Sequence, residues 1–445
     1  MNQSNDMDLP KGVTNNIREV FGYIQRFKEK VFVLKLDDDL LDSPLFSVLV
    51  KDIVHIKNMG IKVVLVLGAH NSINKVLETY GVATDFEDRI RITSQEALPL
   101  VKLGASNVSN EVLTLLSENG ASGVLGNWIK AREVGVLQGK DYQNTGKVDS
   151  INLSVVNKLL EEGLVPILTN IGWSSTGKPY NISSNDVAVS LAGAIQAAKL
   201  FFIGTKPGIN SIEDCQVKKL EIRETGVFSA LELSQAEELL EKHGEHFDFK
   251  DRELIEHALR ACHSGVNRIH IIDGSQDGIL LQEIFSTKGH GTMFHANLYS
   301  NIRLAIAEDI PEILHIMQSY VERGVLIQRT TEDIAKKLGS YYVYEVDDAI
   351  HGCCALTLYS DGSAEIEAVV VNVDFSGKGT GAKMISYLVE KSKKENMHQV
   401  FILTTQSKDY FMRLGFENAK RDSLPLEKRN EYNEGRKSKV MSLML

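Results

Sequence analysis

The sequence contains little cysteine, and the cysteines that it has show no metal-binding or disulfide-forming spacing. Only four occur in 445 residues, at Cys215, Cys262, Cys353 and Cys354. Two are adjacent, and no Cys-x-x-Cys motif is present. Because zinc sites and disulfide frameworks depend on such spacings, we predict free thiols in a reducing compartment and no bound metal.

The sequence also lacks a long hydrophobic run and an excess of positive charge. No apolar stretch approaches the roughly 20 residues that span a membrane, and the polar residues 1–11 do not resemble a secretory signal. The formal net charge is −10, without a basic stripe or aromatic–basic interleaving. We therefore expect no nucleic acid and no membrane as partner, and we predict a cytoplasmic protein that binds small molecules.

The remaining composition is that of an ordinary globular protein, with 43% hydrophobic residues and only 8 prolines. Before about residue 295, short apolar strands alternate with helical stretches, which is typical of an α/β sandwich with a mainly parallel sheet. After it, a helix followed by paired strands indicates an α+β domain. We predict domains over residues 1–286 and 301–445, joined by a linker over residues 287–300.

Ten short apolar segments are expected to form strands. Those of the first domain lie at residues 31–36, 63–67, 165–168, 200–204 and 268–272. Those of the second lie at residues 341–346, 352–359, 365–373, 400–403 and 440–443. An amphipathic helix is predicted over residues 15–28, and its apolar stripe suits packing on its own domain or on another subunit.

The most specific motif is a glycine turn between the strand at residues 365–373 and a helical stretch from residue 382. Alternate glycines let backbone amides approach a ligand, and a helix N-terminus adds about half a positive charge, so a pyrophosphate is the expected guest. A glycine-rich loop without a ligand remains the alternative. The candidate residues are Ser376, Gly377, Lys378, Gly379, Thr380 and Gly381.

This turn resembles the acyl-CoA loop of the GNAT-type N-acetyltransferases, although Ser376 stands where they usually have Gln or Arg. Residues 326–329, 365–371, 401–405 and 436–440 also occur in the order of bacterial-type N-acetylglutamate synthase. That family fuses an amino-acid-kinase-like domain to a GNAT domain, and the resemblance covers nearly the whole chain. It implies acetyl transfer from acetyl-CoA to the α-amino group of L-glutamate, the first step of arginine biosynthesis.

The first domain resembles the amino-acid kinase fold, with acetylglutamate kinase as the nearest member, over residues 33–36, 65–70 and 180–185. In active kinases glycines follow the first strand. Here three carboxylates, at residues 37–39, stand where a triphosphate binds and would repel it. Asn185 replaces the aspartate that organises the phosphoryl site. We therefore predict a sensor domain without kinase activity.

The same domain resembles the arginine site of arginine-sensitive acetylglutamate kinases. The resemblance implies that Glu283 pairs with a cationic group of L-arginine, since a carboxylate matches a guanidinium in bidentate geometry. It also implies a homo-oligomer, a hexamer in that family, linked by the N-terminal helix. A structural role remains the alternative for each residue. The candidate effector residues are Tyr23, His270, Glu283, Gly289 and Gly291.

Acetyl transfer needs a base, because the α-amino group of glutamate is mostly protonated at neutral pH. Glu365 aligns with the base of the synthase family, and Glu367, on the same strand face, is the rival candidate. The backbone of Val369, Val370 and Val371 is expected to hold the thioester and the pantetheine by ladder-like hydrogen bonds.

Thr404 is the candidate acid for the departing CoA thiolate, because the synthase family places a serine there. Many acetyltransferases use a tyrosine where this chain has Phe411, and Tyr410 is one position off, which on a helix points it about 100° away. Unassisted departure of the thiolate and a packing role for Thr404 remain alternatives.

The two carboxylates of glutamate call for cationic groups. Arg329 and Arg436 match, with Ser438 as a hydrogen-bond donor, because an arginine fork fixes a carboxylate's orientation. A solvated tail is the alternative for Arg436, since residues 428–439 hold five basic side chains.

Three other functions stay open. A bifunctional synthase–kinase requires ATP-dependent phosphorylation of acetylglutamate. A protein lysine acetyltransferase with an amino-acid-sensing module requires neither Arg329 nor Arg436. A non-enzymatic regulator is disfavoured by the glycine turn together with Glu365.

Overall fold

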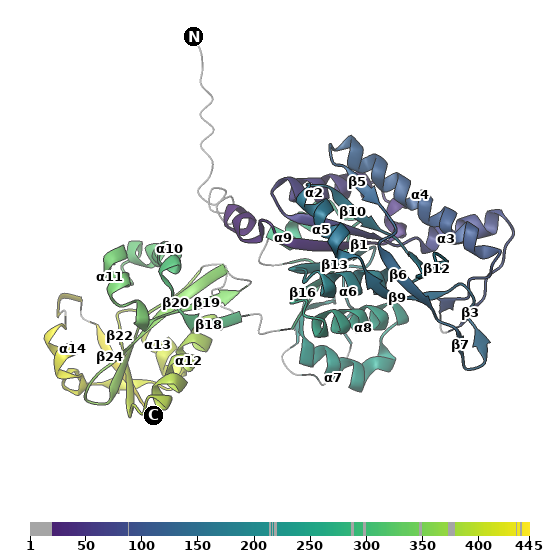
Figure 1. The fold of residues 1–445 in the computed structure, drawn as a ribbon. Helices are drawn as coiled ribbons and strands as arrows, with labels where there is room; N and C mark the ends of the chain where they lie inside the picture. Colours follow the sequence, from purple (N-terminus) through teal and green to yellow (C-terminus); the bar gives the residue numbers. More distant parts are fainter. Residues whose placement is uncertain are drawn as a thin grey trace, which may run out of the picture. The chain divides into compact units, whose positions relative to one another are not determined.

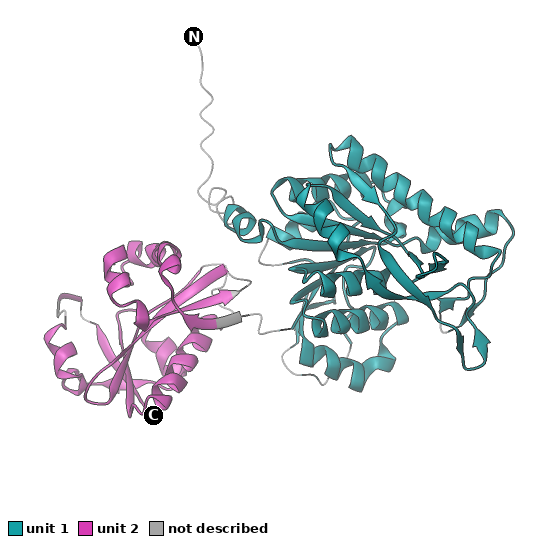
Figure 2. Ribbon diagram, in the orientation of Figure 1, with its two compact units in different colours: residues 1–297 teal, residues 298–445 magenta. Residues whose placement is uncertain are grey.

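The chain divides into two compact units, Met1–Asn297 and Leu298–Leu445 (Figure 2). Among the described helices, none is long and apolar enough to cross a membrane. The computed structural model describes residues 20–87, 89–212, 215, 217, 220–285, 289–296, 300–346, 349–372, 379–432, 434–436 and 438–445.

A nine-stranded sheet forms the centre of the first unit, and its middle strands run parallel, as predicted (Figure 1). On β1, Phe32 and Leu34 belong to one hydrophobic core and Val33 to another, so both faces are covered. The strand order is β14 (Glu221–Ile222), β15 (Phe228–Glu232), β17 (Thr292–His295), β16 (Arg268–Asp273), β13 (Lys199–Gly204), β1 (Val31–Leu36), β2 (Lys62–Leu67), β10 (Val165–Leu168) and β5 (Gly123–Leu125).

Helices supply the apolar residues that cover this sheet. Residues 20–27 are helical, within the predicted amphipathic helix, and Phe27 is buried in the same core as Phe32. That core receives α2 (Phe46–Asn58), α3 (His70–Thr79), α4 (Ala97–Glu118) and α9 (Ile279–Phe285). The other core receives α5 (Leu153–Glu161), α6 (Ser184–Ala194), α7 (Leu233–His243) and α8 (Phe249–His263).

A strand of the first unit lies inside the predicted linker. Strand β17 pairs in parallel with β15 and antiparallel with β16. Its two apolar residues, Met293 and Phe294, are buried, but a run this short shows no periodicity in the sequence. Residues 287–300 are therefore not linker throughout.

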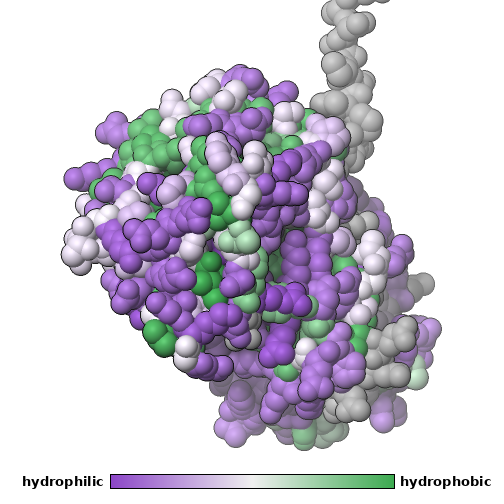
Figure 3. All heavy atoms as spheres, turned by 90° about the vertical axis from the view of Figure 1, so that its right-hand side faces the viewer, coloured by the Kyte–Doolittle hydropathy of each residue, from purple (hydrophilic) through white to green (hydrophobic). Residues whose placement is uncertain are grey.

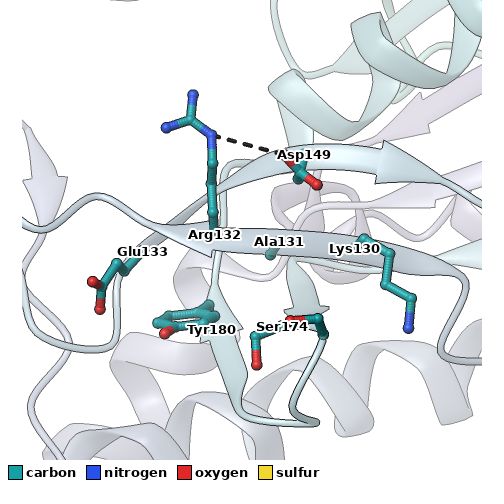
Figure 4. A pocket seen from close by; sticks show the side chains of 8 residues that line it. Lys130, Ala131, Arg132, Glu133, Asp149, Ser174 and Tyr180 are labelled. Carbon is teal, nitrogen blue, oxygen red and sulfur yellow. Dashed lines mark ion pairs between the residues drawn. The ribbon is translucent and has the colours of Figure 1, made fainter.

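A smaller sheet of the first unit carries a depression of about 500 Å³ (Figure 4). Lys130, Arg132, Asp149 and Tyr180 line it, and the Arg132 Nε atom lies 3.9 Å from Asp149 Oδ1. No predicted site residue lines this depression. The strand order is β12 (Pro179–Asn181), β11 (Ile171–Trp173), β6 (Ile129–Glu133) and β9 (Gly146–Ile151).

The second unit is built on a seven-stranded, mostly antiparallel sheet. Helices α10 (Ile310–Glu322) and α11 (Thr331–Lys336) supply one core of this unit, and α12 (Thr380–Lys394) and α13 (Lys408–Arg413) supply another. The strand order is β18 (Ser300–Leu304), β19 (Tyr341–Val346), β20 (Ala349–Leu358), β21 (Ser363–Val371), β22 (Gln399–Thr404), β24 (Lys439–Met444) and β23 (Glu417–Ala419).

The face of the molecule drawn in Figure 3 is largely hydrophilic, with hydrophobic residues in small groups. Large apolar side chains that are strongly exposed in the described chain include Phe21, Tyr80 and Val136. Such single exposed residues are normal for a folded protein in water.

Candidate active site and effector site

Strands β21 and β22 are paired over only three residues. Their parallel pairing joins residues 363–365 to residues 399–401, and the described chain shows no further pairing between them. Beyond this point Ala368 has a left-handed backbone (φ 54°), and the register with β20 shifts between Cys353 and Ala355. Such a bulge bends a strand and leaves backbone groups without ladder partners. Beyond Glu365, the strand segment that we expect to hold the pantetheine therefore has no partner on β22 in the described chain.

Glu365 lies where this separation begins, and its side chain is almost fully buried. Tyr359 donates its hydroxyl hydrogen bond to Glu365 Oε2 over 2.9 Å. The Lys428 ammonium, on α14 (Leu426–Asn430), lies 2.7 Å from the same oxygen. Within the described chain no group donates to Oε1. One oxygen is thus anchored while the other is available to a ligand.

The surroundings of Glu365 change its acidity. Burial raises the pKa of this carboxyl, whereas Lys428 acts in the opposite direction. Burial and the neighbouring Glu365 also raise the pKa of Tyr359, which keeps the tyrosine protonated as a donor. A carboxylate with a raised pKa is a better proton acceptor near neutral pH than an ordinary one.

The rival base, Glu367, is engaged in an ion pair. Its Oε2 atom lies 2.6 Å from an Arg329 nitrogen, and Thr357 donates to Oε1 over 3.3 Å. Arg329 also bonds to the Tyr341 hydroxyl. The guanidinium that we predict for an acceptor carboxylate is therefore already paired with a carboxylate of the chain.

The described part of the glycine turn has the predicted form of a helix N-terminus. Gly379 caps α12 with a left-handed backbone (φ 77°), and Thr380 begins the helix. A Cβ atom on Gly381 would lie 2.8 Å from the Tyr410 hydroxyl, so Tyr410 points at the first turn of α12. Ser376, Gly377 and Lys378 lie outside the described residues.

Val371, at the end of β21, already has a side-chain partner. The Tyr320 hydroxyl donates to its carbonyl over 2.7 Å, and the Val371 amide lies 3.3 Å from the same hydroxyl. Tyr320, which comes from α10, was not identified from the sequence. A pantetheine that used the Val371 backbone would have to share it with this hydroxyl.

Of the candidate acid and acceptor groups, Thr404 and Ser438 lie near the end of β22. Thr404 is its last residue, is buried, and accepts a hydrogen bond from the Ser407 amide over 3.0 Å. It pairs with Lys439, so Ser438 stands just before the adjoining β24. Arg436 donates to the Val325 carbonyl over 3.0 Å, which makes this part of the tail ordered rather than solvated.

In the first unit, Glu283 and His270 form a buried pair beside a backbone loop. The His270 Nδ1 atom lies 2.7 Å from Glu283 Oε1. The His290 amide, over 2.5 Å, and the Gly291 amide, over 3.2 Å, donate to Oε2. Although burial alone would raise it, the hydrogen bonds of His270 and these amides hold the pKa of Glu283 at about 2. The carboxylate is therefore ionised across the neutral range.

Tyr23 and Gly289 complete the cluster of predicted effector residues. Tyr23 lies edge-on to Phe285, with ring centroids 5.2 Å apart, and a Cβ atom on Gly289 would lie 3.2 Å from Glu283 Oε2. The structure adds two cations that the sequence did not reveal. Lys199 Nζ lies 3.5 Å from His270 Nε2, and Arg223 donates to the carbonyls of Gly289 and Gly291 over 3.0 Å each.

The acidic residues after β1 are engaged by groups of the chain itself. Asp37 forms an ion pair with Lys35, and its carboxylate would meet a Cβ atom on Gly68 at 3.2 Å or on Gly204 at 2.8 Å. Asp38 accepts from the Ser72 amide, at the start of α3, over 2.7 Å. The N-terminus of α3, a kind of site that favours anions, thus has a carboxylate of the chain as its partner.

Comparison with known proteins defines the class of protein. Residues 30–273 match the Amino acid kinase family, and residues 337–418 match the Acetyltransferase (GNAT) domain. Fold and site together are those of a GNAT acetyltransferase fused to an amino-acid-kinase-like domain.

Relatives that match along their whole length identify the family. An amino-acid acetyltransferase of Ralstonia nicotianae is 31% identical, over 96% of this chain and 94% of its own. One of Actinobacillus pleuropneumoniae is 30% identical, over 96% of this chain and 97% of its own. The chain belongs to the amino-acid acetyltransferase family: it is an amino-acid N-acetyltransferase, and acetyl-CoA is its co-substrate.

Solved structures agree with this assignment. N-acetylglutamate synthase from Neisseria gonorrhoeae, complexed with coenzyme A and L-arginine, matches with a TM-score of 0.85 and 26% identity, over 97% of this chain and 99% of that one. The same enzyme complexed with coenzyme A and N-acetyl-glutamate matches over the same shares with a TM-score of 0.60 and 27% identity.

Proposed function

We propose that the chain transfers the acetyl group of acetyl-CoA to the α-amino group of L-glutamate, the first step of arginine biosynthesis. The observation that carries this proposal is the placement of Glu365, a buried carboxylate with one anchored oxygen, where β21 and β22 separate. The Neisseria gonorrhoeae relative, complexed with coenzyme A and N-acetyl-glutamate, supports glutamate as the acceptor. A biosynthetic role and four free thiols suit the cytoplasm.

In this proposal Glu365 takes a proton from the acceptor's ammonium, directly or through a water molecule. The neutral amine then attacks the thioester carbonyl, and the tetrahedral intermediate collapses by breaking the carbon–sulfur bond. The nitrogen loses its extra proton in this collapse, and the departing sulfur gains one, so the products are the amide and the CoA thiol. Thr404 is our candidate donor of a proton to the departing thiolate, and it regains a proton from the one that the nitrogen releases. The backbone of Val369, Val370 and Val371 and the turn at Gly379, Thr380 and Gly381 hold the donor, with Ser376, Gly377 and Lys378 as further candidates.

The acceptor's two carboxylates are assigned to Arg329, Arg436 and Ser438. Because Arg329 is paired with Glu367, an acceptor carboxylate has to share or replace that partner. Such an exchange favours a free amino acid, whose own carboxylates can pair with Arg329, over an amine without a carboxylate. Breaking the pair without replacement would leave a partly buried charge without a partner. The loss for a fully buried pair is about 3–5 kcal/mol, and it should be smaller at this partly exposed pair.

The acceptor assignment is tested by measuring thiol release from acetyl-CoA with each of the twenty amino acids. We expect glutamate to react about 10- to 100-fold more efficiently than glutamine, because one charge-assisted hydrogen-bond pair contributes about 1.5–3 kcal/mol. Equal rates with lysine-containing peptides would instead indicate a protein acetyltransferase.

A separate assay tests for kinase activity. With ATP present, acetylglutamate should remain unphosphorylated; an acetylglutamyl phosphate product would reveal a kinase.

L-Arginine is our proposed effector, bound beside Tyr23, His270, Glu283, Gly289 and Gly291. The Neisseria gonorrhoeae relative has been solved with L-arginine. In this chain His270, Gly289 and Gly291 lie around the Glu283 carboxylate, and Tyr23 packs against Phe285 on the same helix as Glu283. We further propose a homo-oligomer, a hexamer by family resemblance, in which the N-terminal helix takes part.

Glu283→Gln should blunt the response of acetyl transfer to arginine. The amide keeps the size of the side chain but loses the charge, so the arginine concentration for half-maximal response should rise at least about tenfold. The measurement is the ratio of activity with and without arginine, over a range of arginine concentrations. Glu238→Gln, at an exposed ion pair with Lys242 on α7, is the matched control. A normal response in Glu283→Gln would move the effector site elsewhere.

A further inference from the structure

Lys428 belongs to a basic stretch of sequence but makes a buried contact in the active site. Its ammonium lies 2.7 Å from Glu365 Oε2, and its side chain is only 17% exposed. The Tyr359 hydroxyl donates to the same oxygen over 2.9 Å. Two donors thus converge on Oε2 from different elements, whereas no described group donates to Oε1.

We propose that Lys428 is a positioning residue for acetyl transfer: with Tyr359 it holds Oε2 of Glu365, so that Oε1 is the atom that accepts the acceptor's proton. The proposal rests on Glu365 being the base. In this proposal Lys428 acts through Glu365, whose Oε2 atom it contacts.

The segment that carries Lys428 is itself held in place. Leu424, just before α14, is buried in a cluster with Phe401, the residue that pairs with Glu365 across β21 and β22. Arg429 donates to the carbonyls of Asp422 over 2.7 Å and Leu424 over 3.0 Å. The backbone that carries Lys428 is therefore fixed by packing and by hydrogen bonds.

The charges around Glu365 explain why a cation is needed there. Glu367 on the same strand is a like charge, itself paired with Arg329, and Tyr359 beyond β20 is a neutral donor that interacts with Glu431. Phe401, its partner on β22, has no charge. Lys428 is then the cation in direct contact with a buried carboxylate. A buried carboxylate without a counter-ion tends to take up a proton and can no longer act as a base.

The test is the pH dependence of kcat/KM for the amino-acid acceptor, in the wild type and in Lys428→Met and Lys428→Arg. Dividing each profile by that of the wild type removes the titration of the acceptor's own ammonium. In Lys428→Met the acidic limb of the profile should move to higher pH. At pH 7 we expect kcat/KM to fall by up to about tenfold, and to recover as the pH rises. Lys428→Arg should retain most activity. Lys393→Met, at an exposed lysine on α12, should follow the wild type.

A second variant keeps the test decisive if Lys428→Met does not fold. Tyr359→Phe removes the other donor to Oε2 while keeping the ring beside Phe401, and should move the acidic limb in the same direction, by less. A pH-independent loss of activity in Lys428→Met, or unchanged profiles in both variants, would overturn the proposal. If Glu365→Gln abolishes turnover while these profiles stay unchanged, the role of Lys428 is rejected and Glu365 remains the base. If Glu365→Gln stays active, the assignment of Glu365 as the base is rejected too.

Discussion

Glu365→Gln should lower the turnover number of acetyl transfer by about 100- to 10,000-fold, the usual contribution of a general base. The amide has the size of the carboxylate but cannot take a proton from the acceptor's ammonium. Binding of acetyl-CoA should change little, because we assign the donor to the backbone of β21 and to the turn before α12. The measurement is kcat for glutamate together with the dissociation constant of coenzyme A.

Glu367→Gln is the matched control for this variant. Glu367 lies on the same strand, but its carboxylate is paired with Arg329 and held by Thr357. We therefore expect its replacement to act mainly on KM for glutamate, through Arg329, with a smaller effect on kcat. If Glu367→Gln lost turnover and Glu365→Gln kept it, the two glutamates would have exchanged roles.

Arg436→Met should raise KM for glutamate by about 10- to 100-fold with a smaller effect on kcat. The reason is the loss of a charge-assisted hydrogen bond to an acceptor carboxylate, which contributes about 1.5–3 kcal/mol. Among the residues that the structure describes, Arg436 donates through one nitrogen to the Val325 carbonyl, which leaves its other donors for a ligand. The measurement is steady-state kinetics with glutamate and with glutamine.

Arg436→Lys separates charge from geometry at the same position. Lysine keeps the positive charge without the planar fork, so we expect an intermediate KM. If Arg436 contacts the side-chain carboxylate, the preference for glutamate over glutamine should shrink in Arg436→Met. An unchanged KM in both variants would remove Arg436 from the acceptor site and leave its bond to Val325 as its role.

Much of the fold was predictable because its strands are continuous apolar runs, whose burial needs no knowledge of the partner. The runs that became β1, β2, β10, β13 and β16 are examples. Strand β17 was missed because its apolar part is two residues long and is stabilised by pairing with β15 and β16. Pairing energy of this kind is not encoded in local sequence.

The site was predictable only in part, for a related reason. The glycine turn stands out because it has a recognisable local pattern, and Glu365 because it aligns with the base of the synthase family. Lys428 appeared in the sequence as one of several basic residues on a solvated tail, and only the turn before α14 brings it to Oε2 of Glu365. Tyr320 and Tyr410 likewise acquire their contacts with Val371 and Gly381 from helix packing.

The sequence by itself determined the class of fold and the glycine turn, because hydrophobic periodicity and backbone freedom are local properties, and it supplied the candidate residues through resemblance to the synthase and kinase families. Only the tertiary structure decided how the charged groups are paired: Glu365 with Lys428, Glu367 with Arg329, and Glu283 with His270. Pairing of buried charges depends on distance and on exclusion of water. Both quantities exist only after residues far apart in the chain have been packed together.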